Sequence, residues 1–291
     1  ALDLARLAAL TDDGLLGPRI ADVAVPGLTP DRPISATGLQ ELLRCPYRYF
    51  HHRVLGFDEP ARAPALREIE QPAYGALVHA ILEEFFRAHG PRFCAREGHL
   101  EAWLAAAKRI VQRRFTEFLE QYPLAGARIR AKERERLSSD VADLLRAEWD
   151  LGPRRFVAAE REFGRPAPVP LPLGARTLYV TGTVDRIDDD GRTLVRDLKT
   201  GRVDRRVGAN AAPDPVGDLQ IALYGLVAER LAAAWGTPPT VGVAYIGRHG
   251  AVRAFVDDFA TVLAPAARAW LALAAELLAT RLFPRTPSAE D

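Results

Sequence analysis

Two aspartates and a lysine near the ends of two predicted strands are the residues of this sequence best suited to chemistry. Asp185 lies in the apolar segment Leu178–Ile187, and Asp197 lies in the next one, Leu194–Leu198, with Lys199 directly after it. Asp189–Gly191 between them are typical turn residues and predict a hairpin. A hairpin centred there places Asp185 opposite position 196 or 197, so the two carboxylates converge.

Two unpaired carboxylates at close range repel each other, and a divalent cation relieves the conflict. Mg²⁺ binds one or two carboxylates together with water and phosphate oxygens. Lys199 shares a strand face with Asp197, where its ammonium would orient or deprotonate an attacking water. The pattern indicates metal-dependent phosphodiester cleavage. The alternative is a solvated Asp/Lys hairpin, which is the interpretation we favour for Asp188–Asp190.

Four further polar residues are candidates for the same site. His79 lies in the amphipathic segment Tyr74–His89 and is either a metal ligand or a satisfied core residue. Glu160 is a carboxylate in an otherwise apolar strand, which indicates an additional metal ligand or, equally, an edge strand or a salt bridge. Gln220 and Tyr224 are one helical turn apart on one face. Packing alone would explain Tyr224, whereas Gln220 is harder to place in a core.

The elements that position these residues are predicted from apolar periodicity. The segment Ser35–Leu39 opens a helix with a hydroxyl available as N-cap; this helix reaches Cys45–Pro46, and the aromatic patch Tyr47–Phe50 follows. The remaining predicted elements are the helix Tyr74–His89, two or three helices within 100–150, strands Phe156–Phe163, Leu178–Ile187 and Leu194–Leu198, the helix Asp218–Trp235, strands Val241–Ile246 and Val252–Phe255, and a helix at 261–282. This order predicts an α/β fold with a mixed central sheet flanked by helices, plus a helical insertion.

Composition sets further expectations about the whole chain. Residues 1–33 contain several Pro and Gly residues, so we expect a linker from an upstream domain, followed by one domain over 34–291, with a helical part at about 75–150 and a sheet core at about 156–260. The absence of Met predicts a piece of a longer polypeptide. The net charge of +1 neither favours nor excludes a nucleic-acid partner. With no apolar run expected to span a membrane and only two cysteines, we expect a cytoplasmic protein.

Five motifs in this order resemble the PD-(D/E)XK nuclease superfamily in its RecB-like branch, and most closely the C-terminal nuclease domain of AddB-type helicase–nuclease subunits. They are Ser35–Phe50, Gly75–His79, Gly182–Asp188, Asp197–Gly201 and Leu219–Tyr224. The resemblance implies a restriction-endonuclease-like core.

In that family the matching residues bind a divalent metal and assist hydrolysis. The resemblance implies that His79, Asp185, Asp197 and the backbone carbonyl of Leu198 bind Mg²⁺ or Mn²⁺, with Glu160 at a less regular acidic position. It implies that Lys199 serves the attacking water. It also implies that Gln220 and Tyr224 support the site.

The branch often holds a [4Fe–4S] cluster on four cysteines, one of them in a Cys-Pro-Tyr segment. Cys45 matches that cysteine, whereas Cys94 does not fit the pattern, and the sequence ends about where the other three would begin. Because the cluster needs four thiolates, it is expected only in a longer parent chain.

The function implied is hydrolysis of single-stranded DNA inside a helicase–nuclease complex that processes double-strand breaks, so DNA and a helicase or nuclease subunit are the expected partners. Arg186, Arg202, Arg205 and Arg206 are expected either to hold the phosphate backbone or to be solvated loop charges. One alternative is an inactive nuclease-like scaffold, against which the intact Asp and Lys set argues. The other is a free-standing nuclease outside any helicase, against which the missing Met and the linker-like start argue.

Overall fold

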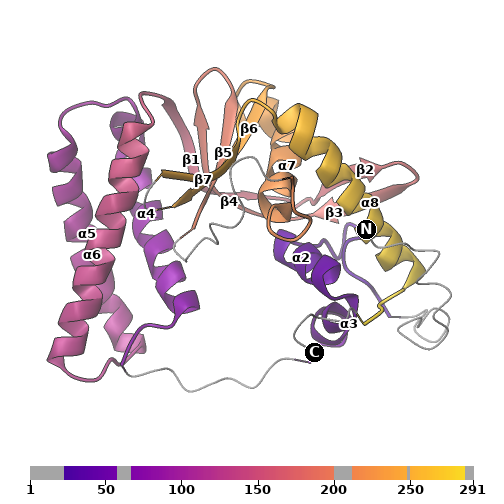
Figure 1. Ribbon diagram of the computed structural model, residues 1–291, viewed down its shortest axis with the longest axis horizontal. Helices are drawn as coiled ribbons and strands as arrows, with labels where there is room; N and C mark the ends of the chain where they lie inside the picture. Colours follow the sequence, from indigo (N-terminus) through magenta and orange to yellow (C-terminus); the bar gives the residue numbers. More distant parts are fainter. Residues whose placement is uncertain (1–22, 58–66, 200–211, 248–249, 286–291) are drawn as a thin grey trace.

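A mixed five-stranded sheet forms the centre of the molecule. The computed structural model describes residues 23–57, 67–199, 212–247 and 250–285 (Figure 1). The strand order is β1-β4-β5-β6-β7, in which only the β5–β6 pair is parallel. The strands are β1 (Arg155–Phe163), β4 (Gly182–Asp189), β5 (Thr193–Leu198), β6 (Val241–Gly247) and β7 (Gly250–Phe255). The predicted α/β class with a mixed sheet is confirmed.

Three long helices form a layer on one side of the sheet, on the left in Figure 1. They are α4 (Gln71–Cys94), α5 (Leu100–Gln121) and α6 (Ala127–Asp150). The apolar residues of α4 recur at helical spacing and form one core cluster with α5, α6 and the sheet residues Leu198 and Ile246. Helix α4 runs on past the predicted end at His89. Gly90 there has no Cβ to clash with the Phe156 ring that packs against it.

The other side of the sheet is covered by a second group of helices. They are α2 (Ala36–Arg44), α7 (Leu219–Trp235) and α8 (Ala264–Thr280), with the short elements α3 (Pro46–Tyr49), η2 (Phe50–Val54) and η3 (Phe259–Leu263). The side chain of Ser35 accepts a hydrogen bond from the Gly38 backbone N–H at 3.2 Å, so the predicted N-cap of α2 is present. These helices share a second core cluster with β2, with β3 and with those residues of β4–β6 that are turned toward them.

The predicted strand Leu178–Ile187 is in fact two strands in different sheets. Its first part is β3 (Arg176–Val180), which pairs with β2 (Val169–Leu173) in a separate hairpin, and its second part is β4. The sequence indicates no strand at β2 because Pro170 and Pro172 alternate with apolar residues. Proline is tolerated where its missing N–H faces away from a partner, as in this two-stranded hairpin.

The described part of the predicted lead-in packs onto the domain. The backbone carbonyl of Gly27 accepts a hydrogen bond from the Tyr179 N–H at 2.8 Å, and Ile34 forms a bridge with Val180. Arg281, after α8, donates to the Val23 carbonyl at 2.8 Å. Residues 23–33 are therefore held against β3 and the end of α8.

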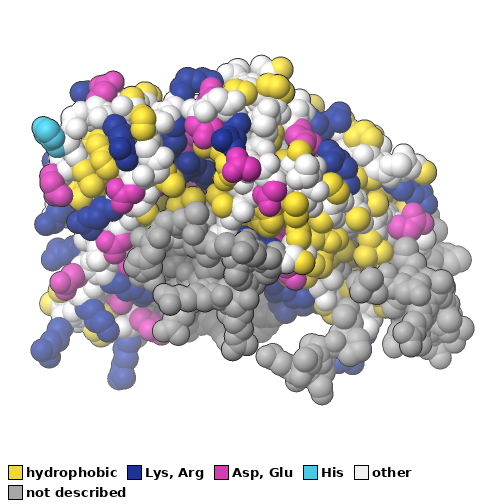
Figure 2. Space-filling model, turned by 45° about the horizontal axis from the view of Figure 1, so that its top comes forward, with side chains coloured by type: hydrophobic (Ala, Val, Ile, Leu, Met, Phe, Trp, Pro, Cys, Tyr) yellow, Lys and Arg dark blue, Asp and Glu magenta, His cyan; other side chains and the backbone are white. Residues whose placement is uncertain are grey.

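Among the described residues, Phe259–Thr280 is the one helical segment long and apolar enough to cross a membrane by length and composition. Arg268 and Glu276 interrupt this segment, so it does not contradict the expectation that the sequence has no apolar run as long as a membrane span. Leu263, Leu271 and Leu278 of this segment are completely buried in the core. A core helix covered on many sides needs the same apolar composition as a membrane span. The surface elsewhere mixes both charges, as the face in Figure 2 shows.

Candidate active site

The two aspartates meet where β4 and β5 cease to pair. The ladder between these strands ends at Arg186 and Arg196, so Asp185 lies one residue beyond it. Its Oδ2 accepts a hydrogen bond from the backbone N–H of Leu198 at 2.7 Å, across the gap between the strands. Asp197 likewise lies one residue beyond the part of β5 that pairs with β4, and its side chain is buried. The charge of Asp197 acts on Asp185, as the predicted convergence of the two carboxylates requires.

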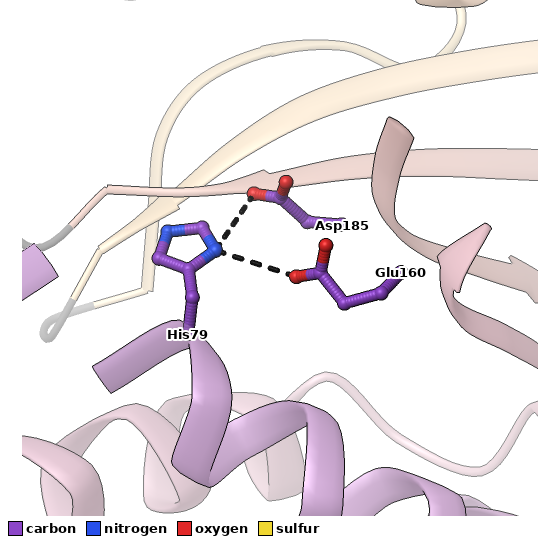
Figure 3. A group of neighbouring side chains, drawn as sticks. All are labelled: His79, Glu160 and Asp185. Carbon is purple, nitrogen blue, oxygen red and sulfur yellow. Dashed lines mark ion pairs between the residues drawn. The ribbon is translucent and has the colours of Figure 1, made fainter. Parts of the chain in front are cut away.

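His79 and Glu160 approach Asp185 from α4 and β1 (Figure 3). The Nδ1 atom of His79 lies 3.5 Å from Glu160 Oε1 and 3.7 Å from Asp185 Oδ2. Its Nε2 atom lies 3.0 Å from the carbonyl oxygen of Leu198. One donor atom from each of the three side chains lies within 4.8 Å of the others. The imidazole therefore faces a carboxylate pair on one edge and a backbone carbonyl on the other.

Glu160 reaches this cluster through an unusual backbone conformation. Its φ angle is +47°, in the left-handed region that residues with a Cβ rarely adopt. In the pairing of β1 with β4, Ala159 and Arg161 have partners on β4, whereas Glu160 between them is not part of the register. A strained residue in a strand, with its side chain beside other candidate ligands, is typical of a functional site.

Lys199 belongs to a second chain of contacts beside the aspartates. Its Nζ lies 2.5 Å from Asp197 Oδ2 and donates a hydrogen bond to Gln220 Oε1 at 3.1 Å. The Gln220 amide in turn donates to the Tyr224 hydroxyl at 3.3 Å. The ring of Tyr245 lies under the ammonium, 4.9 Å from Nζ. The ammonium is thus held by an anion, an amide oxygen and an aromatic face.

The electrostatics of the site are those of crowded, desolvated carboxylates. Burial raises the pKa of Asp185 to about 7, and the nearby charge of Asp197 contributes to the rise. Burial also raises the pKa of Asp197, against the lowering effect of Lys199. Burial alone would lower the pKa of His79, but the hydrogen bond with Glu160 and the charge of Asp185 raise it to about 9. The site therefore retains protons that a cation would displace.

The donor set suits a hard divalent cation. The carboxylates of Glu160, Asp185 and Asp197 and the carbonyl of Leu198 offer oxygens, and His79 offers one ring nitrogen. Mg²⁺ and Mn²⁺ accept such ligands. A cation would also offset the repulsion by Asp197 that contributes to the raised pKa of Asp185, and the repulsion by Glu160 that contributes to the raised pKa of Asp197.

Arg186 does not reach the surface, so its expected role in holding DNA is wrong. Its side chain is completely buried, with Nη1 2.8 Å from Glu148 Oε2 and Nε 3.1 Å from Asp188 Oδ1. The guanidinium stacks on the Phe86 ring at 3.8 Å. It points to the side of the sheet that α4 and α6 cover.

Asp188 is also buried, contrary to the interpretation as a solvated turn residue. Its carboxylate lies 3.0 Å from Arg154 Nε and 3.2 Å from Arg196 Nε. Glu148 on α6 pairs with the same arginines, and although its burial acts in the opposite direction, their charges lower its pKa to about 2. The sequence signal was present: arginines stand inside apolar strands, where a buried charge requires a partner.

The remaining candidates are placed as follows. Arg202, Arg205 and Arg206 lie outside the described residues. Cys45 is half-buried between α2 and α3, next to the segment in which the Tyr47 N–H donates to the Pro284 carbonyl at 3.2 Å. Cys94 is buried, and Arg186 Nη2 donates to its Sγ at 3.0 Å.

Comparison with known families agrees with this geometry. The profile of the PD-(D/E)XK nuclease superfamily matches residues 33–290. The chain therefore belongs to the PD-(D/E)XK nuclease superfamily, and its mixed sheet flanked by helices is consistent with the restriction-endonuclease-like fold. Members of this superfamily are generally nucleases and typically use divalent metals. No curated protein matches the chain.

Proposed function

We propose that this chain is a divalent-metal-dependent deoxyribonuclease whose active site is the cluster at the open end of β4 and β5. The observation that carries the proposal is the convergence of His79, Glu160 and Asp185, with the Asp197–Lys199 ion pair beside them and the charge of Asp197 acting on Asp185. Residues from α4, β1, β4 and β5 supply these groups, so their meeting is a property of the fold rather than of one loop.

Each residue has a role that its contacts support. His79, Asp185, Asp197 and the Leu198 carbonyl would hold Mg²⁺ or Mn²⁺, with Glu160 as a further ligand. When bound, the metal supplies Lewis-acid polarisation of the phosphate and a bound water of lowered pKa. Lys199 orients the attacking water and steadies charge that develops on the phosphate.

Gln220 fixes the ammonium of Lys199, and Tyr224 fixes the Gln220 amide. Burial raises the pKa of Tyr224 to about 12, so its hydroxyl stays protonated and available as a hydrogen-bonding group at neutral pH. The pair therefore acts as a neutral support rather than as an acid or a base.

The resemblance of the five motifs supports the finer assignment. We infer that the chain acts as an exonuclease on single-stranded DNA in the cytoplasm. It would do so within a helicase–nuclease complex for double-strand-break repair and recombination. In this proposal 34–291 form the nuclease domain of an AddB-like subunit, and Cys45 contributes to a [4Fe–4S] cluster in the parent protein.

The test is cleavage of end-labelled single-stranded DNA by the purified chain. We expect cleavage with Mg²⁺, none with EDTA, and a loss of at least about 10²-fold in Lys199→Ala, because a positioned proton-transfer group contributes about 10²–10⁴-fold. Lys108→Ala, an exposed lysine on α5, is the matched control and should keep full activity.

Two results would count against the proposal. Unchanged cleavage by a folded Lys199→Ala variant would rule out the role assigned to Lys199. A folded wild-type chain that neither binds Mg²⁺ nor cleaves DNA would favour the inactive scaffold instead.

A further inference from the structure

One row of side chains crosses three neighbouring strands beside the candidate active site. Asp197 on β5 stands opposite Tyr245 on β6, and Tyr245 stands opposite Arg253 on β7. Residues that are directly opposite in a ladder place their side chains on the same face of the sheet. The row therefore runs from a candidate metal ligand to the edge of the sheet, on the face that α7 covers.

Arg253 is buried although its strand lies at an edge of the sheet. Its side chain is 4% exposed, and its Nε lies 2.7 Å from Asp218 Oδ1. Its Nη2 donates to the Ala212 carbonyl at 3.0 Å, and the guanidinium lies over the Phe255 ring at 4.9 Å. Asp218 is buried as well, so both charges of this ion pair are removed from solvent.

Asp218 is the N-cap residue of α7, yet its side chain makes no capping hydrogen bond. An aspartate at this position normally accepts from one of the first backbone N–H groups of the helix. Here Oδ1 is paired with Arg253, and Oδ2 accepts from the Asp214 N–H at 2.8 Å. The Tyr245 hydroxyl accepts from the Ile221 N–H instead. Arg253 thus holds the Asp218 carboxylate away from the helix and against the sheet.

Two further side chains hold the segment 212–218, which leads into α7. The Tyr245 hydroxyl donates to the Gly217 carbonyl, and Gln40 Nε2 on α2 donates to the Val216 carbonyl at 2.9 Å. Of these three anchoring side chains, Arg253 is the one that carries a charge. The start of α7 is therefore fixed by residues from α2, β6 and β7.

The position of this helix start bears on the chemistry because Gln220 lies in the first turn of α7. Gln220 Oε1 accepts from Lys199 Nζ, which also pairs with Asp197. A buried ion pair adds little net stability compared with an apolar pair, and its best-attested use is to select one arrangement. The Arg253–Asp218 pair selects the arrangement of the turn that begins two residues before Gln220.

We propose that Arg253 is a positioning residue for Lys199 and acts through Asp218 and Gln220. The guanidinium fixes Asp218, Asp218 fixes the first turn of α7, and Gln220 in that turn holds the Lys199 ammonium beside Asp197. This inference rests on the proposed function and adds a residue of β7 to its machinery. Because Arg253 acts on the ammonium and not on the metal ligands, the affinity for Mg²⁺ should not change when Arg253 is replaced.

Magnetic resonance of the lysine side chains tests this proposal without catalysis. The chain has three lysines, so lysine isotopically labelled at Cε gives three signals, and Lys199→Ala assigns the one from the site. The Lys199 ammonium lies 4.9 Å from the centroid of the Tyr245 ring, whose ring current separates its signal from those of the exposed Lys108 and Lys132. We expect the Lys199 signal to move toward those two signals in Arg253→Met.

Arg155→Met is the matched control. Arg155 also pairs with an aspartate, Asp189, at 2.6 Å and also donates to a backbone carbonyl, that of Gly236, at 2.7 Å. These contacts lie at the other end of α7, so the Lys199 signal should stay in place in this variant. An unmoved Lys199 signal in folded Arg253→Met would overturn the proposal.

Hydrolysis of a small phosphodiester, bis(4-nitrophenyl) phosphate, at saturating Mg²⁺ measures the consequence for the reaction. We expect Arg253→Met to lower kcat by about tenfold with KM unchanged, because a small misplacement of a positioned group costs up to about 10²-fold. The loss should disappear in a Gln220→Ala background, since residues that act in one chain are not additive. An equal loss in both backgrounds would show that Arg253 acts by another route and would overturn the proposal.

A neutral pair separates positioning from stability. Removing one partner leaves the other charge buried and destabilises the fold, whereas Arg253→Met/Asp218→Asn leaves no charge unpaired, and the asparagine oxygen still accepts from Asp214. This double variant should recover stability to urea but keep the moved Lys199 signal and the lowered kcat. Recovery of kcat along with stability would show that Arg253 serves the fold alone.

The two readouts also separate this proposal from the proposed function. A folded wild-type chain that hydrolyses neither the small phosphodiester nor DNA would count against the nuclease assignment. The Lys199 signal decides the role of Arg253 in either case.

Discussion

At the residue scale, the protons held by Asp185 and His79 define how the site takes up a metal. Coordination needs an ionised carboxylate and a neutral imidazole, but the metal-free pKa values are about 7 and about 9. We expect the affinity for Mg²⁺ to rise from pH ~6 to ~9, by up to about tenfold per pH unit for each proton released. Calorimetric titration in two buffers of different ionisation enthalpy counts those protons.

The stability of the metal-free protein supplies a control on the same groups. Raised folded-state pKa values mean that the folded protein holds extra protons, which stabilises it at low pH. Stability should therefore fall as pH rises, through about 7 for Asp185 and about 9 for His79, and saturating Mg²⁺ should remove this fall. A Mg²⁺ affinity that does not vary over this range would contradict the assignment of these ligands.

The left-handed backbone of Glu160 makes a separate prediction about stability. Both Glu160→Ala and Glu160→Gly remove the carboxylate, so both should weaken Mg²⁺ binding to a similar extent. Only glycine adopts φ +47° without a steric cost, so Glu160→Gly should be more stable than Glu160→Ala by about 1 kcal/mol. Urea unfolding of the two variants tests this; equal stability would show that the conformation is not strained.

At the element scale, Tyr245 joins β6 to the start of α7. It stands opposite Asp197 in the β5–β6 ladder, and its hydroxyl donates to the Gly217 carbonyl at 2.9 Å and accepts from the Ile221 N–H at 3.4 Å. The first N–H groups of a helix have no partner within it, so this hydroxyl caps α7. Sequence reasoning missed Tyr245 because its apolar strand gives no sign of a polar task.

Tyr245→Phe keeps the ring under Lys199 and removes both hydrogen bonds. We expect stability to fall by about 1–3 kcal/mol, because buried backbone groups lose their partner. We expect kcat on DNA to fall several-fold with little change in KM, because Gln220 in the first turn of α7 no longer holds Lys199 firmly. Steady-state kinetics with urea unfolding measure both.

Tyr122→Phe is the matched control for this change. The Tyr122 hydroxyl also accepts from a backbone N–H, that of Glu70, at 3.3 Å, but it joins the end of α5 to the start of α4. The Tyr122→Phe variant should be less stable than the wild type but should keep the wild-type kcat on DNA. An unchanged kcat in Tyr245→Phe would show that Tyr245 contributes to stability and not to activity.

At the scale of the whole molecule, the sheet has a different cover on each side, and the site lies where the two meet. The α4–α6 side holds the buried charges Arg154, Arg186, Arg196, Glu148 and Asp188, which bind α6 to β4 and β5. Each of Asp185 and Asp197 is next to one of these arginines in its strand. The network therefore fixes the two strand ends that carry the candidate ligands.

The local parts of this arrangement can be predicted from the order of the residues. Apolar periodicity predicts most helices and strands within a few residues, and the turn at Asp189–Gly191 brings Asp185 to Asp197, because a hairpin has little freedom between its ends. Ser35 likewise marks the start of α2. These features depend on neighbours in the chain, which the sequence displays directly.

Long-range packing sets which distant groups join the hairpin and which residues are covered. His79 and Glu160 reach Asp185 through the packing of α4 and β1 on the sheet, over separations that no local pattern encodes. Alternation along β4 separates Asp185 from Arg186 but leaves open which face another element covers. Helix α6 covers the Arg186 face, so the residue expected to bind DNA is buried, and the carboxylates beside it form the candidate site.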